Sequence, residues 1–219
     1  MSTNTVPIAT DAKGQESTTK LVFEGWEISK VAEARLPTAH GIFRIVAFTN
    51  TFDHREHIAI VHGDVDGQTD LWTRLHSECL TGDVFSSLKC DCGQQLEAAL
   101  AHLGQHECGA ILYLRQEGRG IGLANKVMAY QLQDHGLDTV EANHHLGFDD
   151  DLRDYRVAAA MLRLLGVQGV RLMTNNPKKI QGLQEHSVEV TGREPIAILP
   201  NRHNLRYLET KRSKSGHLL

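Results

Sequence analysis

The period of the hydrophobic pattern changes near Gln94, and this change most limits the folds open to the chain. Residues 41–50 and 57–65 alternate apolar and polar side chains and are rich in β-branched residues, as expected of strands, and residues 71–78 give a third such segment. From Gln94 to residue 103, apolar residues recur at helical spacing. Strands that come first and later alternate with helices predict a single mixed α/β domain with a strand-rich N-terminal half.

The second half of the chain alternates short apolar runs with amphipathic stretches. The pattern predicts a strand at 109–114, a helix at 121–134, a loop at 143–151, a helix at 153–165 and a strand at 170–174. Gly166 is suited to end the second of these helices. Pro177 predicts the first turn of a further helix, with Asn175 and Asn176 as candidate N-caps.

The overall composition narrows the class of protein. A formal net charge of −4, without interleaved basic and aromatic residues, argues against nucleic acid as a partner. No apolar run approaches the ~20 residues of a membrane span, and residues 1–20 lack the apolar core of a secretory signal. We therefore expect a cytoplasmic protein without membrane association, with a flexible polar leader at residues 1–28 and the folded domain at 29–219.

Three of the four cysteines, Cys79, Cys90 and Cys92, fall within fourteen residues. In a reducing compartment such a cluster is more often a metal site than a set of disulfides. The sequence has no Cys-x-x-Cys motif, so a redox role is disfavoured. Three thiolates leave the fourth position of a tetrahedral zinc ion to water, as in catalytic sites, whereas a structural site would need a histidine. Both alternatives stay open, and the candidate histidines are His76, His102 and His106.

Two segments rich in glycine or asparagine could bind an anionic ligand. Residues 114–123 connect a predicted strand to a predicted helix, so backbone N–H groups and Arg119 could hold phosphate while Glu117 accepts from amino groups. Residues 174–180 repeat this arrangement around Lys179. Taken alone, each segment is more typical of a capped helix with solvated charges.

An acidic run at 149–151 comes just before a predicted helix, with Asp151 two residues ahead of Arg153. Such a run usually complements the helix dipole. A buried Asp–Arg couple beside a metal could instead act as a base and a phosphate clamp. Arg74, just before the cysteine cluster, is a further candidate cation.

The order of these motifs carries a family resemblance. The blocks RLHSECLTGDVFSSLKCDCG, RQEGRGIGL, DTVEAN, LGFDDDLRDY and TNNPKKI together resemble GTP cyclohydrolase II from about Val31 to the C-terminus. The resemblance implies that GTP loses C8 of guanine as formate and its outer phosphates as pyrophosphate. The product would be a diaminopyrimidine ribosylamino phosphate, in the first step of riboflavin biosynthesis. It also implies a homodimer whose catalytic domain is residues 29–219. Because the leader at 1–28 is too short for the butanone-phosphate synthase domain that some family members carry, we expect a monofunctional enzyme.

The resemblance also implies roles for individual residues. The ligands of one zinc ion per chain would be Cys79, Cys90 and Cys92, and Mg²⁺ would accompany the triphosphate. Asp151 matches the proton acceptor, Arg153 the residue that attacks the α-phosphate, and Tyr130 a tyrosine near the opening imidazole ring. The implied GTP contacts are Arg74, Leu75, His76, Ser77, Glu78, Gln95, Glu117, Gly118, Arg119, Thr139, Thr174 and Lys179.

Three alternatives remain beside these implied roles. Because an arginine side chain stays protonated, Arg153 could stabilise the departing pyrophosphate, oriented by Asp151, rather than act as a nucleophile. The chain could be a variant cyclohydrolase that stops at the ring-opened formamide, although Tyr130 argues against this. It could also be a zinc-stabilised nucleotide-binding module without catalysis.

Overall fold

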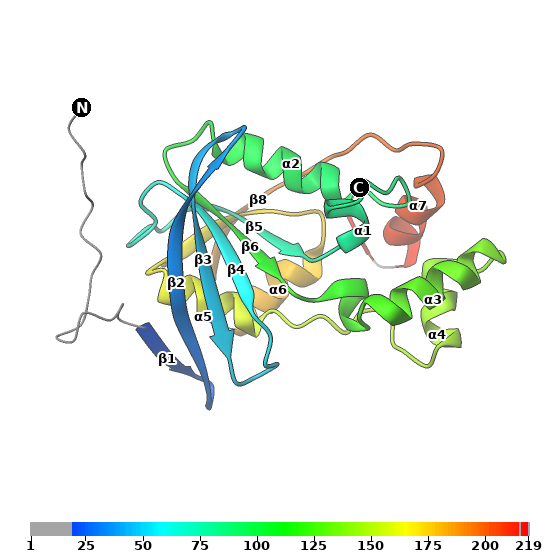
Figure 1. The fold of residues 1–219 in the computed structure, drawn as a ribbon, viewed down its shortest axis with the longest axis horizontal. Coiled ribbons are helices and arrows are strands. Elements are labelled where there is room, and N and C mark those ends of the chain that lie inside the picture. Colours follow the sequence, from blue (N-terminus) through cyan, green and yellow to red (C-terminus); the bar gives the residue numbers. More distant parts are fainter. Residues whose placement is uncertain (1–18, 215, 219) are drawn as a thin grey trace.

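The computed structural model describes residues 19–214 and 216–218, which form one curved eight-stranded sheet with helices on both faces (Figure 1). The strands are β1 (Thr19–Phe23), β2 (Trp26–Thr38), β3 (Gly41–Asn50), β4 (His57–His62), β5 (Leu71–Ser77), β6 (Gly109–Leu114), β7 (Gly169–Met173) and β8 (Glu189–Glu194). The helices are α1 (Leu80–Asp83), α2 (Cys92–Leu103), α3 (Leu123–Asp134), α4 (Thr139–His145), α5 (Arg156–Leu164), α6 (Pro177–Glu185), α7 (Leu205–Lys214) and the short 3-10 helix η1 (Glu117–Gly120). The predicted single mixed α/β domain is confirmed.

The sheet has two halves that differ in strand direction. Its order is β1-β2-β3-β4-β6-β5-β7-β8. Neighbours from β1 to β6 are antiparallel, and tight turns such as Glu24–Gly25, where both residues have positive φ, connect consecutive strands. β6, β5, β7 and β8 are parallel to one another and need crossovers, which run through α2, α5 and α6. The change of hydrophobic period near Gln94 thus marks the entry into the first of these crossover helices.

Apolar side chains form a separate core layer on each face of the sheet. β6 shows the alternation, because Leu112 and Leu114 join the layer under α5 while Ile111 joins the layer under α2. α5 lies so deep that all its residues from Val157 to Leu162 are buried. Figure 1 shows α2 on one face and α5 with α6 on the other. Within the described ranges, no helix is long and apolar enough to cross a bilayer.

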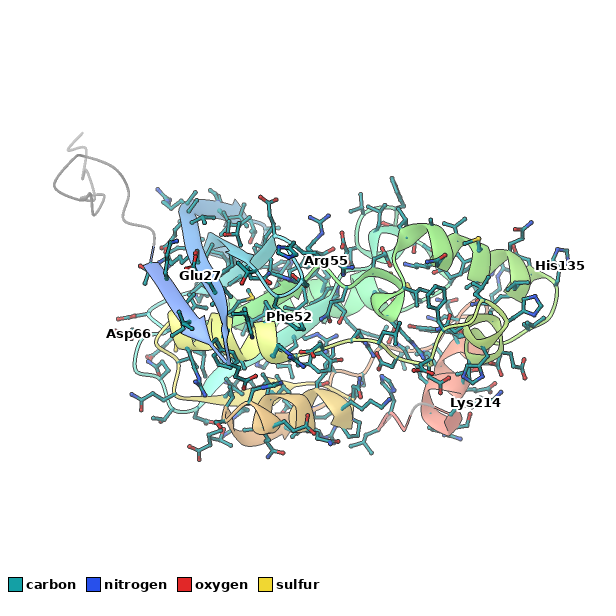
Figure 2. The ribbon with its side chains drawn as sticks, turned by 90° about the horizontal axis from the view of Figure 1, so that it is seen from below. Glu27, Phe52, Arg55, Asp66, His135 and Lys214 are labelled. Carbon is teal, nitrogen blue, oxygen red and sulfur yellow. The ribbon has the colours of Figure 1, made fainter. Side chains whose placement is uncertain are left out.

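Helices α3, α4 and α7 gather at one end of the molecule, next to the carboxyl ends of the parallel strands (Figure 1). Figure 2 places His135, at the end of α3, and Lys214, in α7, at this end, whereas Asp66 lies at the opposite end. These helices are not part of the strand-helix layers, so they are available to build the walls of a site.

Three helices start at residues other than those expected. The helix expected from Ile121 begins at Leu123. The helix expected from Gln94 begins at Cys92. The helix expected from Arg153 begins at Arg156, after the N-cap residue Tyr155, and the Asp154 carboxylate accepts the N–H of Arg156 at 2.8 Å. The expected cap of α6 is confirmed for Asn176, whose side chain accepts from the Lys178 N–H at 3.0 Å.

Two other expectations are wrong in part. The loop expected at 143–151 is helical at its start, because Asp138 and Glu141 form a capping box that begins α4 ahead of it. The flexible leader expected at 1–28 is wrong for residues 19–28, which form β1 and the start of β2 as an antiparallel pair. The first part of that leader, residues 1–18, lies outside the described residues.

Candidate active site and metal centre

The candidate site lies where three neighbouring parallel strands end. β5, β6 and β7 end at Ser77, Leu114 and Met173, and their parallel register brings these ends to the same edge of the sheet. The polar segments found in the sequence follow directly: the cysteine cluster, the glycine-rich loop and the asparagine turn. Together with residues of α3, α4 and α7, they line one cavity.

The three cysteines form one compact group in this cavity. Their Sγ atoms lie within 4.8 Å of one another, and 3.6 Å separates those of Cys79 and Cys90, while Cys92 opens α2. Gly82 is required beside them, because a Cβ there would lie 2.8 Å from the Cys90 Sγ. Asp83 fixes the loop by accepting the N–H of Cys79 at 2.9 Å.

The donor set fits a zinc ion held by three sulfurs. Among the described residues, no histidine or carboxylate joins the sulfur group. The Nε2 atom of His76 lies 3.0 Å from the Asp83 carboxylate, and the rings of His102 and His106 pack against Trp72 instead. The structure therefore does not form the Cys₃His alternative, and three protein ligands are what it brings together.

Lys126, which the sequence reasoning missed, lies against this sulfur group. Its Nζ donates to the Cys79 Sγ at 3.1 Å and to Glu117 Oε1 at 2.7 Å, and Glu117 Oε2 accepts the Leu80 N–H at 2.7 Å. Burial works to lower the pKa of Lys126, but the Cys79 thiolate and the hydrogen bond to Glu117 raise it above its ordinary value. Lys126 thus stays charged, offsets negative charge on the sulfurs and orients Glu117.

Four basic side chains form a second group in the same cavity, here named the buried cation group: Arg74, Arg153, Lys179 and Lys211. Arg74 is 4% exposed and Lys179 is 5% exposed, so water solvates neither charge well. The Nη1 atom of Arg74 donates to the Met173 carbonyl at 2.9 Å, and its Nη2 donates to the Gln95 side chain. The concentration of positive charge in one buried place contrasts with the net charge of −4 of the whole chain.

Lys179 is the least compensated member of the buried cation group. Its Nζ donates to the carbonyl of Leu75 at 2.6 Å, a neutral partner. Burial and then the positive charges of Arg74 and Arg153 hold the pKa of Lys179 well below its usual range. Burial likewise lowers the pKa of Arg74, to about 10. An anion placed in the cavity would relieve this repulsion, so the group is suited to bind one.

Arg153 is held in place by Asp151. The Nε and Nη2 atoms of the arginine donate to the two carboxylate oxygens at 2.7 Å each, in a bidentate pair. Burial works to raise the pKa of Asp151, but the hydrogen bonds from Arg153 hold it below the ordinary value. The couple seen in the sequence is therefore real and partly buried, with the guanidinium facing the cavity and the carboxylate behind it.

The glycine-rich loop turns sharply to present Glu117 and Arg119 to the cavity. Gly118 and Arg119 both have left-handed backbone angles, with φ of 64° and 60°. A Cβ at Gly118 would lie 3.0 Å from Ile121 and 3.1 Å from Lys126, so glycine is needed for close packing as well as for its φ. This backbone conformation directs the polar side chains of the loop inward.

All but two of the residues expected at the site line the cavity. They are Arg74, His76, Ser77, Glu78, Cys79, Cys90, Cys92, Gln95, Glu117, Gly118, Arg119, Tyr130, Thr139, Arg153, Thr174 and Lys179. Leu75 is fully buried in the core and contributes only its carbonyl, through Lys179. Asp151 lies behind Arg153 and does not line the cavity.

Besides Lys126, several lining residues escaped the sequence reasoning: Lys89, Asn143, Tyr207 and Lys211. Lys89 lies over the Tyr130 ring, with its Nζ 4.8 Å from the ring centroid. Tyr207 and Lys211 are spaced i, i+4, so they share one face of a helix, and that spacing was the only signal available for them. Asn143 fell in a segment interpreted as a loop.

The sequence of this chain is similar to that of known enzymes. Residues 29–195 match the family model of GTP cyclohydrolase II. GTP cyclohydrolase-2 of Citrobacter koseri is 53% identical over 88% of this chain and 98% of that protein. Riboflavin biosynthesis protein RibBA of Bacillus mycoides is 54% identical over 88% of this chain, which spans 48% of that protein.

Structural comparison adds little. RibBX, a two domain 3,4-dihydroxy-2-butanone 4-phosphate synthase from A. baumannii, matches with a TM-score of 0.43 and 16% identity over 78% of this chain and 40% of that chain, too weak to carry an argument. The family model covers most of the chain, and the identity to GTP cyclohydrolase-2 extends over nearly all of that relative. The chain belongs to the GTP cyclohydrolase II family.

Proposed function

We propose that this chain hydrolyses GTP as a zinc-dependent GTP cyclohydrolase II. Formate and pyrophosphate would be released, and 2,5-diamino-6-hydroxy-4-(5-phosphoribosylamino)pyrimidine would remain, in the first step of riboflavin biosynthesis. The observation that carries the proposal is that the buried cation group and the three-cysteine group line one cavity. Arg74 and Lys179 are buried with only neutral hydrogen-bond partners, which suits a triphosphate, and three thiolates suit a catalytic metal.

The cavity offers separate groups for the two ends of the nucleotide. Arg74, Arg153 and Lys179 of the buried cation group would bind the phosphates, with Thr174 and the N-terminus of α6 beside them. Glu117, fixed by Lys126 and the Leu80 N–H, would accept hydrogen bonds from the amino edge of guanine. A zinc ion held by the three cysteines would act as a Lewis acid and lower the pKa of bound water.

Arg153 would act as a charge stabiliser. Burial works to lower its pKa, but the neighbouring Tyr155 and the hydrogen bonds to Asp151 raise it above the ordinary value. A guanidinium kept charged in this way is a poor nucleophile, but it can hold the charge that develops as pyrophosphate departs. Asp151 would orient Arg153 through the bidentate pair, so the role we propose for the couple differs from attack on the α-phosphate.

Tyr130 would assist at the imidazole end. Its hydroxyl lies 3.4 Å from Thr81 Oγ1, and its ring lies near Lys126, with the Nζ 5.7 Å from the ring centroid. The tyrosine therefore faces the cavity from the side on which the sulfur group lies. From this place its hydroxyl could donate to the ring as it opens and help complete deformylation.

Further features of the proposal come from the family resemblance. Mg²⁺ would bind mainly to the phosphate oxygens and water. The enzyme would be a homodimer in the cytoplasm, with residues 29–219 as its catalytic domain. Sedimentation of the purified chain tests the dimer, and titration of Mg²⁺ against turnover tests the second metal.

The test of the reaction is incubation of the zinc-loaded protein with GTP and Mg²⁺, followed by mass analysis of the products. We expect formate and pyrophosphate in a ratio near one. Pyrophosphate without formate would indicate a variant that stops at the ring-opened formamide. Bound but unchanged GTP would leave only a nucleotide-binding module and would contradict the proposal.

A further inference from the structure

The C-terminal helix α7 lies beyond residues 29–195, the part of the chain that matches the family model. It nevertheless places Tyr207 and Lys211 in the cavity. Figure 1 shows α7 close to α1 and to the start of α2, which carry the cysteine cluster. A segment outside the family match therefore completes the candidate site.

Three contacts connect this C-terminal segment to three different walls of the cavity. Lys211 pairs with Asp91 in the cysteine loop, and Lys214 pairs with Asp138, the cap of α4. Beyond the helix, the Leu218 N–H donates to the carbonyl of Asn175 at 2.8 Å. The segment thus connects the cysteine loop (here also named the metal loop, residues 79–92), the start of α4 and the asparagine turn at residues 174–176.

The contact of Lys211 is the most buried of these. Its Nζ lies 2.9 Å from Asp91 Oδ1, with the two side chains 11% and 2% exposed, whereas the Lys214 side chain is 43% exposed. Asp91 stands in sequence between two of the three cysteines. The Tyr207 ring supports the contact, with its centroid 4.3 Å from the Lys211 Nζ.

Asp91 also connects Lys211 to two residues expected to bind the nucleotide, Gln95 and Arg74. Its second carboxylate oxygen accepts from Gln95 Nε2, and the Gln95 side-chain oxygen in turn accepts from Arg74. The backbone carbonyl of Asp91 also accepts the N–H of Gln95, which fixes the first turn of α2. A continuous chain of bonds therefore runs from Lys211 through Asp91 and Gln95 to Arg74.

Asp91 without its partner would be an uncompensated negative charge next to metal-binding thiolates. Removing one partner of a buried ion pair is costly, because the other is left desolvated and unpaired. The loop could relieve that cost only by moving Asp91 toward water, and Cys90 and Cys92 would move with it. The geometry of the sulfur group therefore depends on Lys211.

We propose that Lys211 is a positioning residue, which acts through Asp91 to hold the metal loop and Gln95 in place for metal and nucleotide. The nucleotide part of this inference rests on the proposed function, and the metal part does not. A bond network that orients metal ligands typically contributes roughly 10–100-fold to metal affinity or activity.

The test compares Lys211→Met with Arg212→Met in the full chain. Both changes remove one positive charge from α7, but Arg212 is exposed. The readouts are the rate of zinc release to a chelator and the kcat and KM for GTP. We expect Lys211→Met to release zinc about tenfold faster and to raise the KM, with Arg212→Met within about twofold of wild type.

Two further variants keep the inference falsifiable if Lys211→Met destabilises the protein. Lys211→Arg keeps the charge, and the double variant Lys211→Met/Asp91→Asn removes the unpaired carboxylate. Both should release zinc more slowly than Lys211→Met, because neither leaves a buried charge alone. A role confined to holding α7 in place would predict no rescue by Asp91→Asn.

The outcomes separate this inference from the proposed function. Wild-type protein that holds zinc but leaves GTP unchanged overturns the proposed function, and zinc release still decides the role of Lys211. Zinc release from Lys211→Met at the wild-type rate, with α7 still helical by circular dichroism, overturns the inference. The same holds if the double variant releases zinc as fast as Lys211→Met.

Discussion

Two groups of buried or half-buried charge in this molecule are built in opposite ways. In the loop between β3 and β4, Asp53 accepts from Asn50 at 2.8 Å and from the Arg55 N–H at 3.0 Å, and its carboxylate lies 3.1 Å from the His57 ring. In the buried cation group, the charged neighbours that lower the pKa of Lys179 are other cations.

The difference between the two groups separates a structural role from a functional one. A charge whose hydrogen bonds are supplied by its own loop stabilises that loop and has no need of a ligand. A buried cation with a neutral partner and like charges around it, as Lys179 has, costs free energy until an anion enters. Changes in the first group should thus affect stability, and changes in the second should affect binding and catalysis.

The largest effect is expected from the metal ligands. Cys90→Ser should lower turnover of GTP on the order of a thousandfold, because the Lewis acid is lost. Zinc content and turnover should fall together while circular dichroism shows the fold retained. Cys108→Ser is the matched control, since this half-buried cysteine lies outside the sulfur group. Unfolding of Cys90→Ser on metal loss would instead indicate a structural metal.

The next effect is expected from the buried cation group. Lys179→Met should weaken GTP binding by about 1.5–3 kcal/mol, the range for hydrogen bonds to a charged group, or roughly tenfold to a hundredfold in the KM. Without nucleotide, its melting temperature should equal or exceed that of wild type, because a repelled buried charge is removed. A lower melting temperature with unchanged KM would mean that Lys179 is only structural.

The loop between β3 and β4 should behave in the opposite way, so that a change at Asp53 alters stability and not GTP binding. Burial works to raise the pKa of Asp53, but hydrogen bonds from His57, Asn50 and Arg55 lower it to about 2. A carboxyl whose folded pKa lies below its unfolded value of about 3.9 stabilises the fold above pH 4, and that contribution is lost as the pH falls toward 2.

Asp53→Asn tests this sign. It should reduce the free energy of unfolding by about 2 kcal/mol at pH 7 and by much less near pH 2, and it should leave the KM for GTP unchanged. Urea unfolding at the two pH values provides the measurement. An equal loss at both would show that the carboxylate charge does not stabilise the loop.

The smallest effect is expected at an exposed ion pair. Lys20 in β1 lies 2.8 Å from Glu27 in β2, with both side chains well exposed. Lys20→Met should change the free energy of unfolding by less than about 0.5 kcal/mol, since water screens such pairs. A larger loss of unfolding free energy would show that exposed charges at the sheet edge also stabilise the fold, and not only the buried groups compared above.

The sequence predicted those parts of the fold that have a local signal. β3, β5 and β6 alternate or carry apolar runs, and Asn176 with Pro177 starts α6 as expected. β8 and α7 lack such a signal: no residue of β8 is fully buried, and α7 is rich in charged residues. Both are held by long-range contacts that a local pattern does not contain.

The same limit applies to the site. The cysteine cluster, the glycine-rich loop and the Asp151–Arg153 couple are short in sequence, so their chemistry could be predicted. Lys126 lies 47 residues from Cys79, and Lys211 lies 120 residues from Asp91. No pattern in the sequence distinguishes a lysine that is the buried partner of the cysteine loop from a lysine that is a solvated charge, so only the fold reveals these two.

The most direct test of the account is the affinity of the zinc-loaded protein for a GTP analogue with a methylene group between the α and β phosphorus atoms, compared with its affinity for guanosine. Each charge-assisted phosphate contact is worth about 1.5–3 kcal/mol, so the analogue should bind to wild type at least about a hundredfold more tightly than guanosine. Lys179→Met should reduce that ratio. Equal affinities for the two ligands in wild type would contradict the claim that the buried cation group holds a triphosphate.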